Sequence, residues 1–236
     1  MGNSDLQILR WGIPGWITVF TYSILVLSLN KFDLYKYASD HDLNGAYMAG
    51  MAALFVAAGV PLGYIVYQVY FYFKWRMMKK DKITKALKGI NLYDKLIFKS
   101  ENPWEDWQNA ERSFDAYLTL FISKEKVNYE DVMRRYNSFK SRTDRVHGLG
   151  ATICGTILSF VAFITIHIFL FEIPIYKNVT FLITSFILLI IWLIIFKNYK
   201  DSNDATFVQM KHIMYDVEIQ IRSMKKSNND AKSTSP

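Results

Sequence analysis

Hydrophobic residues in this chain are gathered into four long blocks, separated by segments rich in charge. The blocks have no Asp, Glu, Lys or Arg in their interiors, and they lie at residues 11–29, 47–73, 149–171 and 179–196. A helix needs about 20 apolar residues to cross the hydrocarbon core of a bilayer. A water-soluble helix of this length usually shows a polar face along one side. The pattern therefore predicts an all-α membrane protein with four transmembrane helices.

The polar segments between and after the blocks give the predicted domain organisation. It comprises a first pair of spans, a cytoplasmic helical domain, a second pair of spans, a cytoplasmic heptad helix and a disordered tail, at residues 1–80, 81–148, 149–197, 198–226 and 227–236. In the central domain, Asn102 and Pro103 mark the start of a helix, and Asn128 can cap a second helix that continues into the third block. These two helices are predicted to form a hairpin.

The heptad helix carries apolar residues at alternating spacings of three and four. They are Phe207, Met210, Met214, Val217, Ile221 and Met224. A seam this narrow is typical of helices that pair along their length. It predicts an interface between copies of the chain or with a partner helix. Packing of the seam back onto the cytoplasmic hairpin is an alternative that the spacing leaves open.

Positive charge is concentrated on one side of the predicted membrane. Residues 74–147 hold 17 of the 28 Lys and Arg residues, and seven more follow Phe196. Lys and Arg gather on the cytoplasmic side of membrane proteins. Both termini and the central domain are therefore predicted to be cytoplasmic, in the inner membrane of a cell. Anionic lipid explains the net charge of +7, so direct binding of nucleic acid is not expected.

Few residues offer chemistry of their own. Cys154 is the only cysteine, and no metal cluster or phosphate loop is present, so no cofactor is predicted. Within the blocks the polar residues are uncharged, with His167 near the outer end of the third. Charge-coupled transporters generally carry ionisable residues inside the membrane. The sequence thus argues against that class.

Arg142 and His147 form the one catalytic candidate, with the R-x4-H spacing of HEPN-type ribonucleases. On a continuous helix, a separation of five residues leaves two side chains about 140° apart. No Ser, Cys or carboxylate is spaced to orient the histidine as a base. We therefore predict no enzymatic activity and interpret His147 as an interfacial residue at the start of the third span.

The combination of this motif with a helical membrane protein resembles a known family. The family comprises HEPN-like membrane accessory proteins encoded beside RNA-targeting CRISPR effectors. There the motif is degenerate and the protein assembles into a membrane pore. The resemblance covers one six-residue motif and the general architecture, and four spans depart from the family's pattern. It implies a role in prokaryotic defence and assigns no site residue.

Small residues recur every four positions in two of the spans. They are Gly59 and Gly63 in the second span, and Ala151, Gly155 and Ser159 in the third. Such faces let helix backbones approach closely inside a bilayer. Pro61, between the two glycines, is expected to kink the second span. The faces predict close helix packing, either within one chain or between copies.

These features together predict a membrane-embedded accessory or effector protein of anti-phage defence. It is expected to form homo-oligomers and to permeabilise the membrane when a cytoplasmic protein partner or signal engages it. The alternative is a non-catalytic scaffold that recruits a soluble effector. A transporter subunit or a membrane-bound HEPN-like ribonuclease ranks below both.

Overall fold

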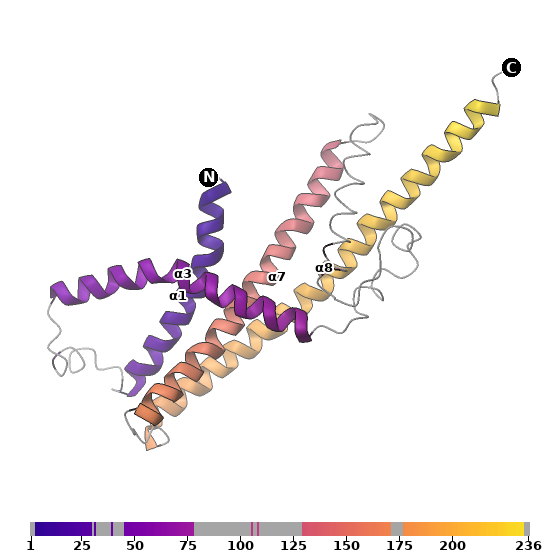
Figure 1. Ribbon diagram of the computed structural model, residues 1–236. Coiled ribbons are helices and arrows are strands. Elements are labelled where there is room, and N and C mark those ends of the chain that lie inside the picture. Colours follow the sequence, from indigo (N-terminus) through magenta and orange to yellow (C-terminus); the bar gives the residue numbers. More distant parts are fainter. Residues whose placement is uncertain are drawn as a thin grey trace. The chain divides into compact units, whose positions relative to one another are not determined.

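The computed structural model describes residues 3–29, 45–77, 129–170 and 177–233, together with positions 31, 39, 105 and 108. Figure 1 shows the long helices α1 (Asn3–Leu29), α3 (Gly45–Met77), α7 (Tyr129–Ile164) and α8 (Val179–Ser233). A π-helical segment, η1 (Thr165–Leu170), follows α7. The described ranges contain no strand. Four of their helices are long and apolar enough to cross a membrane. This confirms the all-α class of the described residues and the four long apolar helices; the first arm of the hairpin lies outside the described residues.

The chain divides into two compact units. Residues 1–73 and 145–200 form the first, which contains the apolar blocks, and residues 74–144 and 201–236 form the second. Both α7 and α8 are continuous helices that contribute to each unit.

In the first unit, α1 packs against α7 through small residues. Ser159 Oγ lies 2.6 Å from the carbonyl oxygen of Thr18 and 2.9 Å from that of Gly155. Gly155 itself lies against the Thr18 hydroxyl and the Pro14 carbonyl. Further along the same helices, Leu25 and Phe163 are fully buried and form a cluster with Phe181 of α8. Small residues thus bring α1 and α7 together, and larger apolar residues add α8.

Pro14 lies inside α1 because the helix begins at Asn3, eleven residues before it. The first apolar block begins at Trp11, so the sequence predicts that Pro14 lies close to the start of this helix. Proline has no N–H to donate to the carbonyl four residues earlier. The Thr18 hydroxyl donates a hydrogen bond to the Pro14 carbonyl at 2.7 Å, which anchors the backbone on the other side of the proline.

α3 crosses α1 rather than lying along it (Figure 1). The crossing is at Gly15, whose backbone approaches that of Gly59 and Gly63. There the Trp16 indole donates a hydrogen bond to the carbonyl of Val56 at 3.0 Å. Towards the N-terminus of α3 the apolar side chains are largely exposed, with Leu54 at 65% and Val56 at 61%. Glycine is required at the crossing because a larger residue on either helix would push the backbones apart.

Asn178 joins the far ends of α1 and α8. Its side-chain oxygen accepts a hydrogen bond from the backbone N–H of Phe181 at 3.0 Å, which caps the start of α8. Its side-chain nitrogen donates to the carbonyl of Leu29, at the end of α1, at 2.9 Å. One side chain therefore satisfies groups at two helix ends, which fixes these ends next to each other.

α8 is the least covered helix of the first unit. Only 6% of the apolar stretch within Val179–Asp216 is buried. Large side chains such as Phe186 (64% exposed) and Ile194 (57% exposed) face outward. In water this surface would drive aggregation, whereas hydrocarbon chains cover it at no cost. The exposed surface of α8 thus agrees with a multi-pass membrane protein.

In the second unit, α7 and α8 are joined by polar bridges. Arg135 forms an ion pair with Asp216 at 2.5 Å, and the Gln209 amide donates to the Ser138 hydroxyl at 3.3 Å. α8 extends to Ser233, so it includes residues 227–233, which the sequence predicts to be disordered. No Gly or Pro occurs between Asn198 and Ser233 to end the helix.

Candidate functional site

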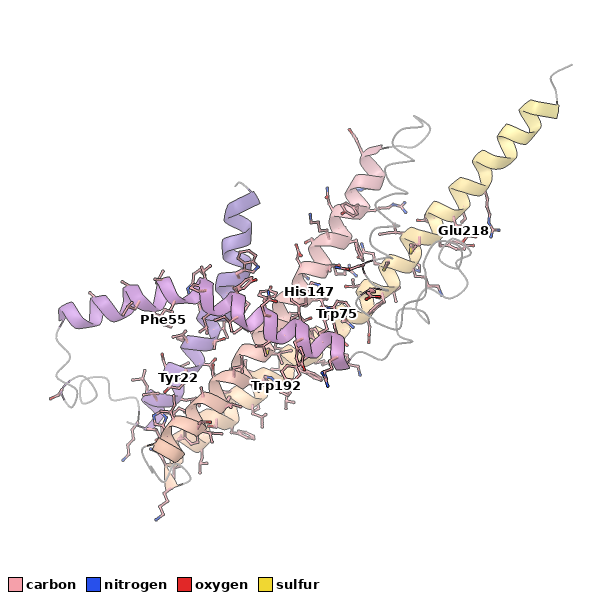
Figure 2. The ribbon with its side chains drawn as sticks, in the orientation of Figure 1. Tyr22, Phe55, Trp75, His147, Trp192 and Glu218 are labelled. Atoms are coloured by element: carbon pink, nitrogen blue, oxygen red, sulfur yellow. The ribbon has the colours of Figure 1, made fainter. Side chains whose placement is uncertain are left out.

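His147 is enclosed where α7 meets α3 (Figure 2). Its ring is 7% exposed, and its centroid lies 4.9 Å from that of Phe71 and 6.0 Å from that of Tyr70. The Tyr70 hydroxyl and His147 Nδ1 are 3.4 Å apart. Gly150, one turn further along α7, leaves room for the Tyr70 ring. The histidine is therefore held by aromatic packing and one long polar contact.

Arg142 is exposed on the same helix and does not share this enclosure. The R-x4-H pair is not brought together within one chain, as the helical spacing predicts. A general base must reach the proton that it removes from a substrate. In the described structure the His147 ring packs against Tyr70 and Phe71 of α3 in its own chain. These contacts are typical of a side chain that holds two helices together.

His167 lies at the other end of α7, within η1. Its Nδ1 donates a hydrogen bond to the carbonyl of Phe163 at 3.1 Å, and its ring stacks on Phe163 with centroids 4.2 Å apart. Tyr22 of α1 completes the aromatic surroundings, with a ring-centroid distance of 6.3 Å to His167. This hydrogen bond joins η1 to the last turn of α7, and α1 supplies an aromatic contact.

The five predicted packing residues all lie at contacts within one chain. Gly59 and Gly63 meet Trp16 and Trp11 of α1, whereas Gly155 and Ser159 meet Thr18. Ala151 is fully buried in a cluster of Val66, Tyr67 and Tyr70. Sequence reasoning missed Gly15 and Gly150, which make equally close contacts. Gly15 stands in the segment RWGIPGW, where its spacing from Gly12 does not follow the four-residue pattern.

Three of the predicted seam residues are buried in the single chain. Phe207 is 7% exposed, Met210 is 3% exposed and Met214 is 1% exposed. This burial favours the alternative in which the seam packs back within the chain. The side chains of Val217, Ile221 and Met224 lie outside the described residues, and pairing along that part of the seam stays a prediction.

A second apolar stripe on α8 is exposed, and sequence reasoning missed it. It comprises Val208 (55% exposed), Tyr215 (55%) and Ile219 (49%), which we call the 208–219 stripe. Spacings of seven and four place the three on one face of the helix. Exposed Lys211 and His212 lie three and four residues after Val208 on the same face, so this stripe lacks the regular apolar spacing by which the seam was predicted.

Within the part of the chain that the structure describes, no group of three or more His, Cys, Asp or Glu residues is placed to hold a metal ion. Cys154 is a free thiol in the middle of α7, next to the cluster around Tyr70.

Replacing His147 with alanine is expected to lower the stability of the purified protein by about 1–3 kcal/mol, because it removes a buried ring and a polar contact. Arg142→Ala, at an exposed position of the same helix, should change stability by less than about 0.5 kcal/mol. Thermal unfolding in detergent measures both. Cleavage of single-stranded RNA that requires both side chains, with unchanged stability in either variant, would contradict the packing role of His147.

Comparisons with protein-family models, known proteins and solved structures give no match for this chain.

Proposed function

We propose that this protein is a non-catalytic membrane accessory protein that holds a soluble protein partner at the membrane. The 208–219 stripe is the observation that carries the proposal. Its three large apolar side chains are about half exposed on the part of α8 that belongs to the second unit. Contact with another protein would remove these three apolar side chains from water.

The residues around the stripe indicate which kind of protein surface would bind it. Lys211 and His212 are exposed beside it. An amphipathic helix with apolar residues at heptad spacing and acidic residues at its flanks would complement this surface. The resemblance described above suggests a nucleic-acid-targeting effector of a prokaryotic defence system as that partner. The spans would serve as the anchor, with both termini and the stripe on the cytoplasmic side.

A second candidate, an oligomer that permeabilises the membrane, is favoured by the uncovered surface of α8. Only 6% of its apolar stretch is buried, which leaves room for further copies. The hydroxyls of Thr18, Thr156 and Ser159 are bonded to backbone carbonyls inside the chain. A pore would therefore have to form between copies. Depolarisation of the membrane on expression of the chain would favour this candidate over the anchor.

Photo-cross-linking in the native cell tests the anchor. A photo-reactive phenylalanine at Tyr215 is expected to form an adduct with one protein. Adding Val208→Asp and Ile219→Asp should abolish this adduct, since the charges disrupt the apolar surface. The matched control carries the photo-reactive phenylalanine in place of Phe186, which is exposed on the apolar part of α8. It should give lipid adducts. A protein adduct at Tyr215 that survives both aspartates, or no adduct there, would reject the proposal.

A further inference from the structure

α3 is longer than an upright transmembrane helix needs to be. Its 33 residues span about 50 Å, whereas the hydrocarbon core is about 30 Å thick. Such an excess is accommodated by tilting of the helix in the bilayer. The contacts of α3 with the other helices show which end of the first unit its C-terminal half lies against.

These contacts lie in one half of the first unit. Between Val56 and Phe71, α3 touches residues 11–16 of α1, residues 147–158 of α7 and Tyr199 of α8. This is the half of the unit where Arg145, Lys197 and Lys200 lie. α3 leaves α1 after the Gly15 crossing (Figure 1), so its C-terminal half runs obliquely across the end of the unit where these basic residues lie.

The outward face of this half of α3 carries polar groups. Tyr64 (49% exposed), Gln68 and Tyr72 (58% exposed) follow one another at four-residue spacing, with Ile65 (55% exposed) beside them. On the opposite face, Val66 is 0% exposed and Tyr70 is 6% exposed. Gln68 makes no hydrogen bond with any residue in the described ranges. An amide left without partners in hydrocarbon costs roughly 2–7 kcal/mol, so this face requires polar surroundings.

We infer that this face lies in the phospholipid headgroup layer of the cytoplasmic leaflet. The Tyr and Gln side chains donate hydrogen bonds to phosphate and ester oxygens there, while the tyrosine rings rest against acyl chains. Trp11 supports this level, because its ring packs edge-on against Tyr64 at 5.7 Å and Trp is typical of membrane interfaces. Lys74 and Arg76, which follow on α3, are complementary to anionic headgroups.

α8 supplies matched positions for a test of depth. Tyr64 precedes Lys74 by ten residues, as Ile187 precedes Lys197. Gln68 precedes Lys74 by six residues, as Ile191 precedes Lys197. Ile187 and Ile191 are exposed to a similar degree, at 51% and 46%. If α3 were as upright as α8, each pair would lie at the same depth, about 15 Å for the first pair and about 9 Å for the second.

The experiment places single spin labels at these four positions in the full chain on a Cys154→Ser background. The labelled protein is reconstituted in mixed phosphatidylcholine and phosphatidylglycerol vesicles. Relaxation is measured with oxygen, with a water-soluble nickel chelate and with a lipid that carries nickel on its headgroup. We expect labels at 64 and 68 to be relaxed by headgroup nickel several-fold more than labels at 187 and 191, and less by oxygen.

Equal depths within each pair would overturn the inference. So would low access of labels 64 and 68 to all three agents together with spin–spin broadening, because this shows that a second copy covers the face. Hydroxyl-radical footprinting of the unmodified chain in the same vesicles gives an independent measurement. Tyr64 should be oxidised at a rate close to that of Tyr72, whereas a rate as low as that of Phe186 would also overturn the inference.

Discussion

Replacing Gly63 with alanine is expected to destabilise the first unit by about 1–3 kcal/mol. A Cβ atom on Gly63 would overlap the carbonyl oxygen of Trp11, and it would also approach the backbone nitrogen of Gly15 at 3.1 Å. Neither group can move without separating α1 from α3, because both belong to the backbone of α1. The Trp16–Val56 hydrogen bond and the cluster around Tyr70 depend on this crossing.

Gly50→Ala is the matched control, since it makes the same change in the same helix. A Cβ at Gly50 meets nothing within 4 Å. Alanine is favoured over glycine inside a helix by about 1 kcal/mol, so this variant should be as stable as the parent or slightly more stable. Thermal unfolding of the detergent-solubilised proteins compares the two. Equal midpoints for Gly63→Ala and Gly50→Ala would show that the helices do not cross at Gly15.

The four long apolar helices could be predicted from the sequence because each depends on local composition. An apolar block long enough to cross a bilayer satisfies its backbone hydrogen bonds within itself. The continuity of α7 was also predictable, since the three-and-four spacing that begins after Asn128 runs on into the third block. Neither prediction required knowledge of which helices touch.

The direction of α3 could not be predicted because it depends on contacts between distant residues. Gly59 and Gly63 indicate a close approach, but not that Gly15 would be the partner. The partner of Asn178 could not be predicted either. With Val179 and Thr180 it forms the N-x-T pattern of a glycosylation site, whereas in the structure its side-chain nitrogen donates a hydrogen bond to the carbonyl of Leu29, 149 residues earlier. Pairings of this kind depend on how the loops close, which local pattern does not encode.

The two stripes of α8 show why candidate interaction residues are harder to predict than helices. A regular spacing reveals that a face will be covered, yet the covering surface can belong to the same chain. Phe207, Met210 and Met214 are covered within this chain. The less regular 208–219 stripe is the one left exposed. Only burial in the folded chain distinguishes the two.

We propose that the chain crosses the membrane with its basic segments in the cytoplasm. The hydrogen bond from Asn178 to Leu29 places the end of α1 and the start of α8 together. Tyr199, twenty residues further along α8, meets Tyr70 at the opposite end of the unit, with ring centroids 6.4 Å apart. Lys31 and Lys177 are therefore expected outside, and Arg76 and Lys200 inside.

Labelling of single cysteines with a membrane-impermeant maleimide tests this arrangement most directly. Each of the four positions is exposed in the chain, and Cys154→Ser removes the native thiol. In intact cells, cysteines at positions 31 and 177 are expected to react fully, whereas those at 76 and 200 should react only after the membrane is permeabilised. Labelling of position 76 or 200 in intact cells, or protection of position 31 or 177, would contradict the proposed crossing of the membrane.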